Sequence, residues 1–200
     1  MDMPRDTGPE QDDDALIARY ASGEGAAARM LTARHAPRAL RFATRMLGGD
    51  IAEAEDVTQE AMLRLWRAAP GWQPGGAKVS TWLYRVVANL CIDRRRRNLP
   101  QPVDPASAPA ATLADGAAGP LAGLVDADRA MALEAALAAL PDRQRQAVVL
   151  RHIEGMANPE IAAVMDIGVE AVESLTARGK RALAAMLAGR REDLGYDDDR

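Results

Sequence analysis

Aromatic and cationic side chains stand close together in the stretch STWLYRVVANLCIDRRRR, which follows the glycine-rich segment GWQPGGAK. Aromatic rings can stack on unpaired bases for about 1–3 kcal/mol each, while arginine holds the phosphate backbone. Packing of a ring in the core, and capping of a helix end by arginine, are the alternatives. The pattern favours binding of single-stranded nucleic acid through side chains that the core does not need, namely Trp82, Tyr84, Arg85, Asn89 and Arg94–Arg97.

The segment IAEAEDVTQEAMLRLWRAA has two different faces when it is read as a helix. Apolar residues recur at spacings of three and four, which predicts a buried stripe made of Ile51, Ala54, Val57, Ala61, Leu65 and Trp66. The opposite stripe places a leucine among acids and an amide, a combination typical of protein-binding patches. A solvated face with one stray leucine is the alternative. The outward residues are Asp56, Gln59, Glu60, Leu63 and Arg67.

The segment NPEIAAVMDIGVEAVESLTARGKRAL predicts a short helix, a tight turn and a longer helix, as in a helix-turn-helix. An ordinary helical hairpin can show the same spacing. In the longer helix, Val172, Leu175, Gly179, Leu183 and Met186 are expected to face inward, with Gly179 suiting a close helix contact. The outward side chains would face a major groove. They are Glu170, Glu173, Ser174, Ala177, Arg178 and Arg181.

Periodicity and chain breaks predict two helical blocks and therefore an all-α protein. Aromatic residues are only 4% of the chain and β-branched runs are few, which argues against sandwiches and barrels. Pro37 is expected to kink or divide the second helix. The predicted helices cover 12–22, 26–47, 50–69, 80–97, 126–140, 141–155, 158–166 and 169–187.

Residues 100–128 contain five prolines and no aromatic residue, which predicts a flexible Pro/Ala-rich linker between two small helical domains. The domains are expected over 15–99 and 129–190, as separate compact units, with acidic tails over 1–14 and 191–200. The net charge of −4 conceals a segregation, because 15–99 holds 14 Lys and Arg against 7 Asp and Glu. This excess indicates a polyanionic partner or, alternatively, a surface that arginine keeps soluble.

Few residues are available for covalent or metal chemistry. Cys91 is the single cysteine and is expected in the core, and the two histidines, His35 and His152, lie far apart. We therefore expect no disulfide, no metal and no cofactor, and without a nucleophile–base pair or phosphate loop an enzyme is the least favoured class. No apolar run approaches about 18 residues and no signal peptide is recognised, so a cytoplasmic protein without membrane insertion is expected.

Three motifs in order resemble the extracytoplasmic-function (ECF) group of the sigma-70 family of bacterial RNA polymerase sigma factors. They are AEDVTQEAMLRLWR, STWLYRVVANLCIDRRRR and LPDRQRQAVVLRHIEGMANPEIAAVMDIGVEAVESL, and the likeness covers about 15–190. The resemblance implies sigma domains 2 and 4, which bind core RNA polymerase, recognise promoter DNA and promote strand opening. The implied partners are the β′ clamp helices and β subunit of the core enzyme, promoter DNA and an anti-sigma factor.

The resemblance also implies a role for each motif. The acidic helix would dock on the β′ clamp through Asp56, Gln59, Glu60 and Leu63. The loop and helix after it would open and read the minus-ten element through Trp72, Lys78, Trp82, Arg85, Asn89, Arg94, Arg95 and Arg96. The linker would thread the polymerase toward the RNA exit. The helix-turn-helix would read the minus-thirty-five element through Glu170, Glu173, Ser174, Arg178 and Arg181.

The reading helix departs from the family pattern, which often has Gly in the turn and then a Lys-Ser-Arg step. Asp166 and Glu173-Ser174-Leu175 stand at those places. The loss of positive charge weakens phosphate contact, although a glutamate can accept hydrogen bonds from cytosine amino groups. Two other functions therefore stay open at this point: a sigma-like mimic that sequesters an anti-sigma factor, and a helix-turn-helix transcriptional repressor.

Overall fold

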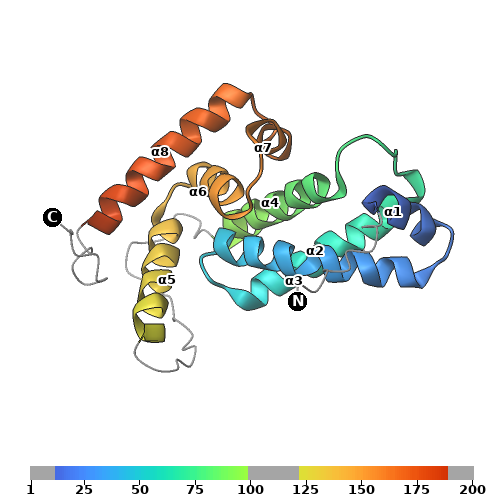
Figure 1. Ribbon diagram of the computed structural model, residues 1–200, viewed down its shortest axis with the longest axis horizontal. Helices are drawn as coiled ribbons and strands as arrows, with labels where there is room; N and C mark the ends of the chain where they lie inside the picture. Colours follow the sequence, from blue (N-terminus) through green and yellow to red (C-terminus); the bar gives the residue numbers. More distant parts are fainter. Residues whose placement is uncertain (1–11, 99–121, 189–200) are drawn as a thin grey trace, which may run out of the picture.

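The computed structural model describes residues 12–98 and 122–188, which are almost entirely helical (Figure 1). These two ranges contain no β-strand, and within them the all-α prediction is confirmed. The first range forms α1 (Asp13–Ala21), α2 (Gly25–Met46), α3 (Ile51–Ala68), the 3₁₀ turn η1 (Ala69–Gly71) and α4 (Val79–Asn98). The second forms α5 (Ala122–Ala139), α6 (Asp142–Val148), the π-helical turn η2 (Val149–Ile153), α7 (Asn158–Met165) and α8 (Val169–Ala188).

Several element boundaries differ from those predicted. Asp13 and Asp14, which the sequence placed both in the acidic tail and in the helix predicted over 12–22, belong to the first turn of α1. Helix α5 begins at Ala122, inside the predicted linker. The rest of the predicted linker and nearly all of the predicted tails lie outside the described residues, which leave out 1–11, 99–121 and 189–200.

Pro37 was expected to kink or divide the second helix, and helix α2 runs without interruption through it, so the proline does not divide the helix. Pro37 is exposed, and the opposite side of the helix is buried on both sides of it, at Leu31, Ala39 and Phe42. Because packing holds both halves of the helix on the core, the chain tolerates the backbone hydrogen bond that proline cannot make.

Helix α3 starts at a side-chain cap and buries most of the predicted stripe. Asp50 Oδ1 accepts a hydrogen bond from the Glu53 backbone N–H at 3.0 Å, which satisfies one free donor of the first turn. The smaller apolar residues of the stripe and Leu65 are fully buried. Ile51 was expected in the core and is 54% exposed, because it lies in the first turn, before the helix meets its neighbours. Trp66 is partly buried and packs on Tyr20, with ring centroids 4.7 Å apart.

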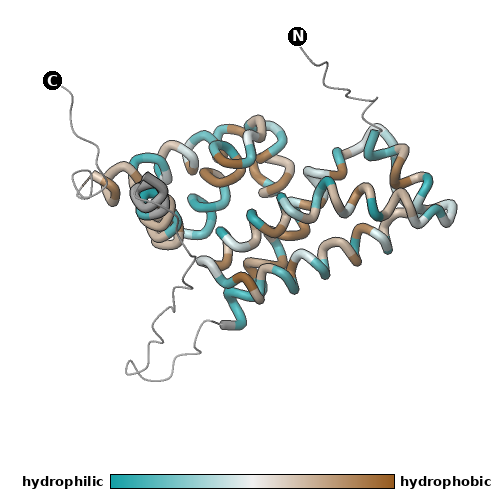
Figure 2. The backbone as a smooth tube through the Cα atoms, turned by 60° about the horizontal axis from the view of Figure 1, so that its bottom comes forward, coloured by the Kyte–Doolittle hydropathy of each residue, from teal (hydrophilic) through white to brown (hydrophobic). Residues whose placement is uncertain are grey.

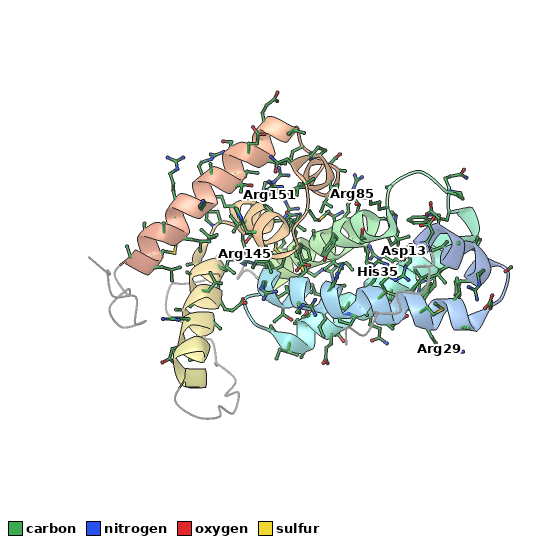
Figure 3. All side chains as sticks on the ribbon, in the orientation of Figure 1. Asp13, Arg29, His35, Arg85, Arg145 and Arg151 are labelled. Carbon is green, nitrogen blue, oxygen red and sulfur yellow. The ribbon has the colours of Figure 1, made fainter. Side chains whose placement is uncertain are left out.

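The interior of the first domain joins all four helices. The predicted burial of Cys91 is confirmed, and burial raises the pKa of its thiol to about 12. Tyr84, which the sequence placed among the outward residues of α4, is buried and meets the Phe42 ring edge to face at 5.2 Å. His35 is also buried, and its Nε2 hydrogen-bonds to Asp13 Oδ2 at 2.8 Å, so this pair fastens α1 to α2 (Figure 3).

The second domain depends on a buried arginine. Arg145 is 1% exposed and donates to the backbone carbonyls of Leu137, Ala138 and Leu140, which end α5. The last carbonyls of a helix have no partners within the helix, so the guanidinium satisfies groups that burial would otherwise leave unpaired. Its Nη1 also donates to the carbonyl of Met46, at the end of α2, over 3.0 Å. Arg145 therefore connects the two domains.

The two domains pack against each other in this structure. Helix α4 contacts α7, and the end of α2 meets α5 and α6 (Figure 1). Buried residues of both domains form one continuous hydrophobic cluster. The tube in Figure 2 alternates hydrophilic and hydrophobic positions along most helices, as expected where each buries one side.

None of the helices in the described parts of the chain is long and apolar enough to cross a membrane.

Candidate nucleic-acid interface

The loop before α4 and the first turns of that helix bring together several side chains predicted to contact nucleic acid. Trp72 and Trp82 meet edge to face, with ring centroids 6.0 Å apart. Lys78 is exposed at the end of the loop, and Arg85 and Asn89 are exposed one and two turns beyond Trp82. We call Trp72, Lys78, Trp82, Arg85 and Asn89 the α4 strip. It combines two partly buried rings with two cations and an amide, a composition suited to stacking and phosphate contact.

Asp14 holds the loop in place, a role that the sequence did not predict. Its Oδ1 accepts from Trp72 Nε1 at 2.8 Å, and its Oδ2 accepts from the Gly75 backbone N–H at 2.9 Å. These two hydrogen bonds, the backbone one first, lower the pKa of the Asp14 carboxyl. In the sequence Asp14 is one of three consecutive aspartates, and a run of acids by itself indicates only a tail or a helix start.

The α4 strip faces the second domain. Lys78 Nζ lies 2.7 Å from Glu160 Oε1 on α7, and each group shifts the pKa of the other, raising that of Lys78 and lowering that of Glu160. Arg85 Nη2 lies 3.7 Å from Asp166 Oδ1, and Figure 3 shows Arg85 between α4 and α7. The buried Tyr84 hydroxyl donates to Glu154. Both cations of the α4 strip are thus paired with acidic residues of the second domain, Lys78 with Glu160 and Arg85 with Asp166.

The arginines near the end of α4 have different partners. Arg94 pairs with Glu53 and, at 3.7 Å, with Asp56 on α3, and Glu53 raises its pKa. Arg95 pairs with Asp142 on α6. Arg96 is exposed. The structure therefore brings Arg94 to the acidic face of α3 and Arg95 to the domain boundary, rather than to the loop that carries Trp72.

The outward face of α3 is exposed as the sequence indicated. Asp56 and Gln59 are open to solvent, Leu63 is 43% exposed, and Glu60 is half-buried. Glu60 Oε1 accepts from Arg64 Nε at 2.8 Å, one helical turn along. An apolar side chain surrounded by carboxylates and an amide remains available to a protein partner.

Helices α7 and α8 form the predicted helix-turn-helix. Asp166 adopts φ +55° and ends α7, and Val172 is fully buried in the corner between the helices. The predicted minus-thirty-five residues, Glu170, Glu173, Ser174, Arg178 and Arg181, are all exposed on α8. Glu173 Oε1 accepts from Asn158 Nδ2 at 3.3 Å, and Arg178 Nη2 donates to Ser174 Oγ at 3.1 Å. The face is therefore a mixture of acidic and basic groups.

Among the described residues, no group of three or more His, Cys, Asp or Glu side chains is arranged to hold a metal ion.

Comparisons with known proteins identify both domains. Residues 31–99 match the family model for Sigma-70 region 2, and residues 130–183 match that for Sigma-70, region 4. The ECF RNA polymerase sigma factor SigM of Mycobacterium tuberculosis (strain H37Rv) is 33% identical over 178 residues, covering 89% of this chain and 86% of SigM. SigE of Mycolicibacterium smegmatis is 36% identical over 167 residues, and this alignment spans 79% of this chain but 60% of SigE.

A solved structure shares the fold. The structure of CnrH in complex with the cytosolic domain of CnrY superposes with a TM-score of 0.66 at 29% identity, covering 88% of this chain and 97% of that chain. CnrH of Cupriavidus metallidurans is also 32% identical over 185 residues, 90% of this chain and 96% of CnrH. The two matched regions, the relatives and the common fold show that this chain belongs to the ECF sigma factors of RNA polymerase, the non-enzymatic subunits that direct transcription initiation.

Proposed function

We propose that this sigma factor docks on the β′ clamp of core RNA polymerase through Asp56, Gln59, Glu60 and Leu63. The observation that supports this docking is that Asp56, Gln59 and Leu63 are exposed together on α3, with the half-buried Glu60 beside them. The α4 strip then meets the minus-ten element, and α8 approaches the minus-thirty-five element. Arg94 and Arg95 support these surfaces from their ion pairs with α3 and α6, and Arg96 remains available for DNA.

The packed arrangement of the domains has a consequence for this function. Lys78 and Arg85 are exposed but pair with Glu160 and Asp166, so contact with DNA phosphates competes with these two ion pairs. Movement of α7 away from α4 would release both cations. The Pro/Ala-rich linker that the sequence predicts between the domains would permit this separation. We infer that polymerase, a cytoplasmic enzyme, holds the two domains apart on the promoter.

An anti-sigma factor is the third partner that we propose. CnrH, which shares the fold, was solved in complex with the cytosolic domain of CnrY. The exposed Glu170 and Glu173 on α8 favour, as a second candidate function, a mimic that binds an anti-sigma factor without reading DNA. Promoter-dependent run-off transcription with core polymerase separates the two. A specific transcript supports the initiation function, whereas anti-sigma binding without any polymerase binding supports the mimic.

The docking surface yields the first prediction. Replacing both Asp56 and Gln59 by Ala should weaken binding to core polymerase by about tenfold or more, because interface residues that matter cost at least 1–2 kcal/mol when truncated. Both side chains are exposed, so the fold should be unaffected. The measurement is a titration of labelled sigma factor with core polymerase.

Asp128→Ala is the control for this variant. Asp128 is an exposed carboxylate on α5, in the second domain, and so lies outside the proposed docking face of α3. It should bind polymerase like the unmodified chain. Unchanged affinity of the double variant would remove this face of α3 from the polymerase interface.

A further inference from the structure

Helix α1 reaches the loop that precedes α4, although about sixty residues separate the two in sequence. The helix lies against η1, where the loop begins (Figure 1). The single side chain of α1 that bonds this loop is Asp14, among the hydrogen bonds of the described residues. Its two carboxylate oxygens each accept one hydrogen bond from a different part of the loop, the Trp72 indole and the Gly75 backbone.

We propose that Asp14 is a positioning residue for promoter opening, which presets the loop over 72–78 and orients the Trp72 ring. This inference rests on the proposed function, in which the loop meets the minus-ten element. Asp14 itself touches no DNA in this account and acts through Trp72 and Gly75.

The geometry explains why a carboxylate is needed. Gly75 adopts φ +76°, a conformation that favours glycine and turns its N–H toward Asp14. The Gly76 N–H closes the same turn on the Gln73 carbonyl at 3.3 Å. Asparagine at position 14 could accept from only one of the two donors, because its amide nitrogen would face the other N–H. A carboxylate accepts from both, and both hydrogen bonds are charge-assisted.

The hydrogen bond to Trp72 also fixes one of the two rings of the α4 strip. The indole nitrogen is held by Asp14, while the ring meets Trp82 edge to face at 6.0 Å. Ordering one loop residue costs about 1–2 kcal/mol of conformational free energy. A loop that is ordered beforehand does not incur this cost when an unpaired base arrives, so strand opening is favoured.

Asp13 provides a matched control beside Asp14. Its carboxylate binds Arg34 and the buried His35, both on α2, and it has no contact with the loop among the hydrogen bonds described. Loss of Asp13 therefore loosens the attachment of α1 to α2. Loss of Asp14 releases the loop and leaves that attachment in place.

The experiment uses the full chain with core polymerase and a promoter identified by mapping transcripts after overexpression. Three properties are measured for each variant: polymerase binding, opening of duplex promoter by permanganate reactivity of thymines, and run-off transcription from the same promoter with a pre-melted bubble. The variants are Asp14→Asn, Asp14→Glu, Asp13→Asn and Trp72→Ala. Tryptophan fluorescence of the free chain, recorded for each aspartate variant with and without Trp72→Ala, separates the contribution of Trp72 from those of Trp66 and Trp82.

For Asp14→Asn we expect unchanged polymerase binding, about tenfold less opening of duplex promoter, and a smaller loss on the pre-melted template. One hydrogen bond to a charged group is worth roughly that factor. The fluorescence of Trp72 should change in Asp14→Asn but not in Asp13→Asn, and Asp14→Glu should recover part of the opening.

Two results would overturn the assignment of Asp14. One is duplex opening by Asp14→Asn equal to that of the unmodified chain while Trp72→Ala is impaired. The other is an equal loss in Asp13→Asn, which would make α1 a structural support only. If Trp72→Ala itself opens the promoter normally, the failure lies instead in the proposed minus-ten role of the loop.

Discussion

At the residue scale, Gly179 determines how closely α6 and α8 can approach. A Cβ atom at this position would lie 2.6 Å from Val148 Cγ2 and 3.3 Å from the Gln144 carbonyl oxygen. The sequence predicted a close helix contact from a glycine in the middle of a helix, where it otherwise costs about 1 kcal/mol relative to alanine. The structure confirms that prediction and identifies the partner helix as α6.

We predict that Gly179→Ala lowers the free energy of unfolding by about 1–3 kcal/mol, because crowding in a packed interface outweighs the gain in helix propensity. Urea unfolding followed by circular dichroism measures the effect. Gly25→Ala is the control, since a Cβ there meets only Arg29 Nη1 at 3.9 Å, and it should leave stability unchanged or slightly raised. A Gly179→Ala variant more stable than the original chain would show that the helices move apart without cost.

At the scale of the element, helix starts in this protein are stabilised unequally. Asp50 caps α3 with a 3.0 Å hydrogen bond from the Glu53 N–H, whereas Asp12, at the same position before α1, makes no side-chain cap. The two aspartates look alike in sequence, since each precedes an amphipathic helix. Only the conformation of the chain before the helix decides whether the carboxylate reaches the free N–H groups.

Asp50→Ala should therefore lower the free energy of unfolding by about 1 kcal/mol, the usual loss for an N-cap. Asp12→Ala should cost at most a few tenths of a kcal/mol, through the helix dipole alone. The same urea titration compares the two variants directly. Equal losses from both substitutions would contradict a specific capping role for Asp50.

At the scale of the whole molecule, the contact between the domains has an apolar interior and an ionic edge. Buried residues of both domains belong to one hydrophobic cluster, and Lys78–Glu160, Arg85–Asp166 and Arg45–Glu134 pair around it. Each exposed pair contributes about 0–1 kcal/mol, so reversing a charge shifts the balance between packed and separated domains by a modest amount.

We predict that Glu160→Lys favours separation of the domains by roughly tenfold at low salt, by removing one ion pair and placing like charges beside Lys78. The separation of the domains is measured by energy transfer between dyes attached at Ser22→Cys and Ala185→Cys, both exposed positions. The native Cys91 should not interfere, because it is buried and should label poorly. The double swap Lys78→Glu with Glu160→Lys restores the pair and should recover the packed state. An effect that persists unchanged at 0.5 M salt would exclude an electrostatic origin.

The sequence was sufficient to predict the class and most of the core. The three- and four-residue spacing of Ala54, Val57 and Ala61 predicted the buried side of α3. The helix-turn-helix followed from a short helix, a turn and Val172. Burial of small and aliphatic residues is a local property of an amphipathic helix, so periodicity detects it. The family followed from three motifs in order, which the matches to regions 2 and 4 confirm.

The partners of the polar residues could not be predicted in the same way. Asp14 binds a loop some sixty residues ahead, Arg94 binds Glu53 on α3, and Arg145 reaches the end of α2. Tyr84 was expected outward and is buried, because the second domain supplies Glu154 for its hydroxyl. The roles of the predicted site residues at polymerase and promoter remain predictions that the experiments above test.

By itself the sequence determined which side of each helix is apolar, where most helices begin and end, and which family the chain resembles. Only the tertiary structure decided which charged groups meet, that the α4 strip faces α7, and that Asp14 holds the loop. The physical reason is that hydrophobic burial is non-directional and repeats with the helix turn, whereas a hydrogen bond or ion pair depends on two particular atoms brought within about 3–4 Å by the whole fold.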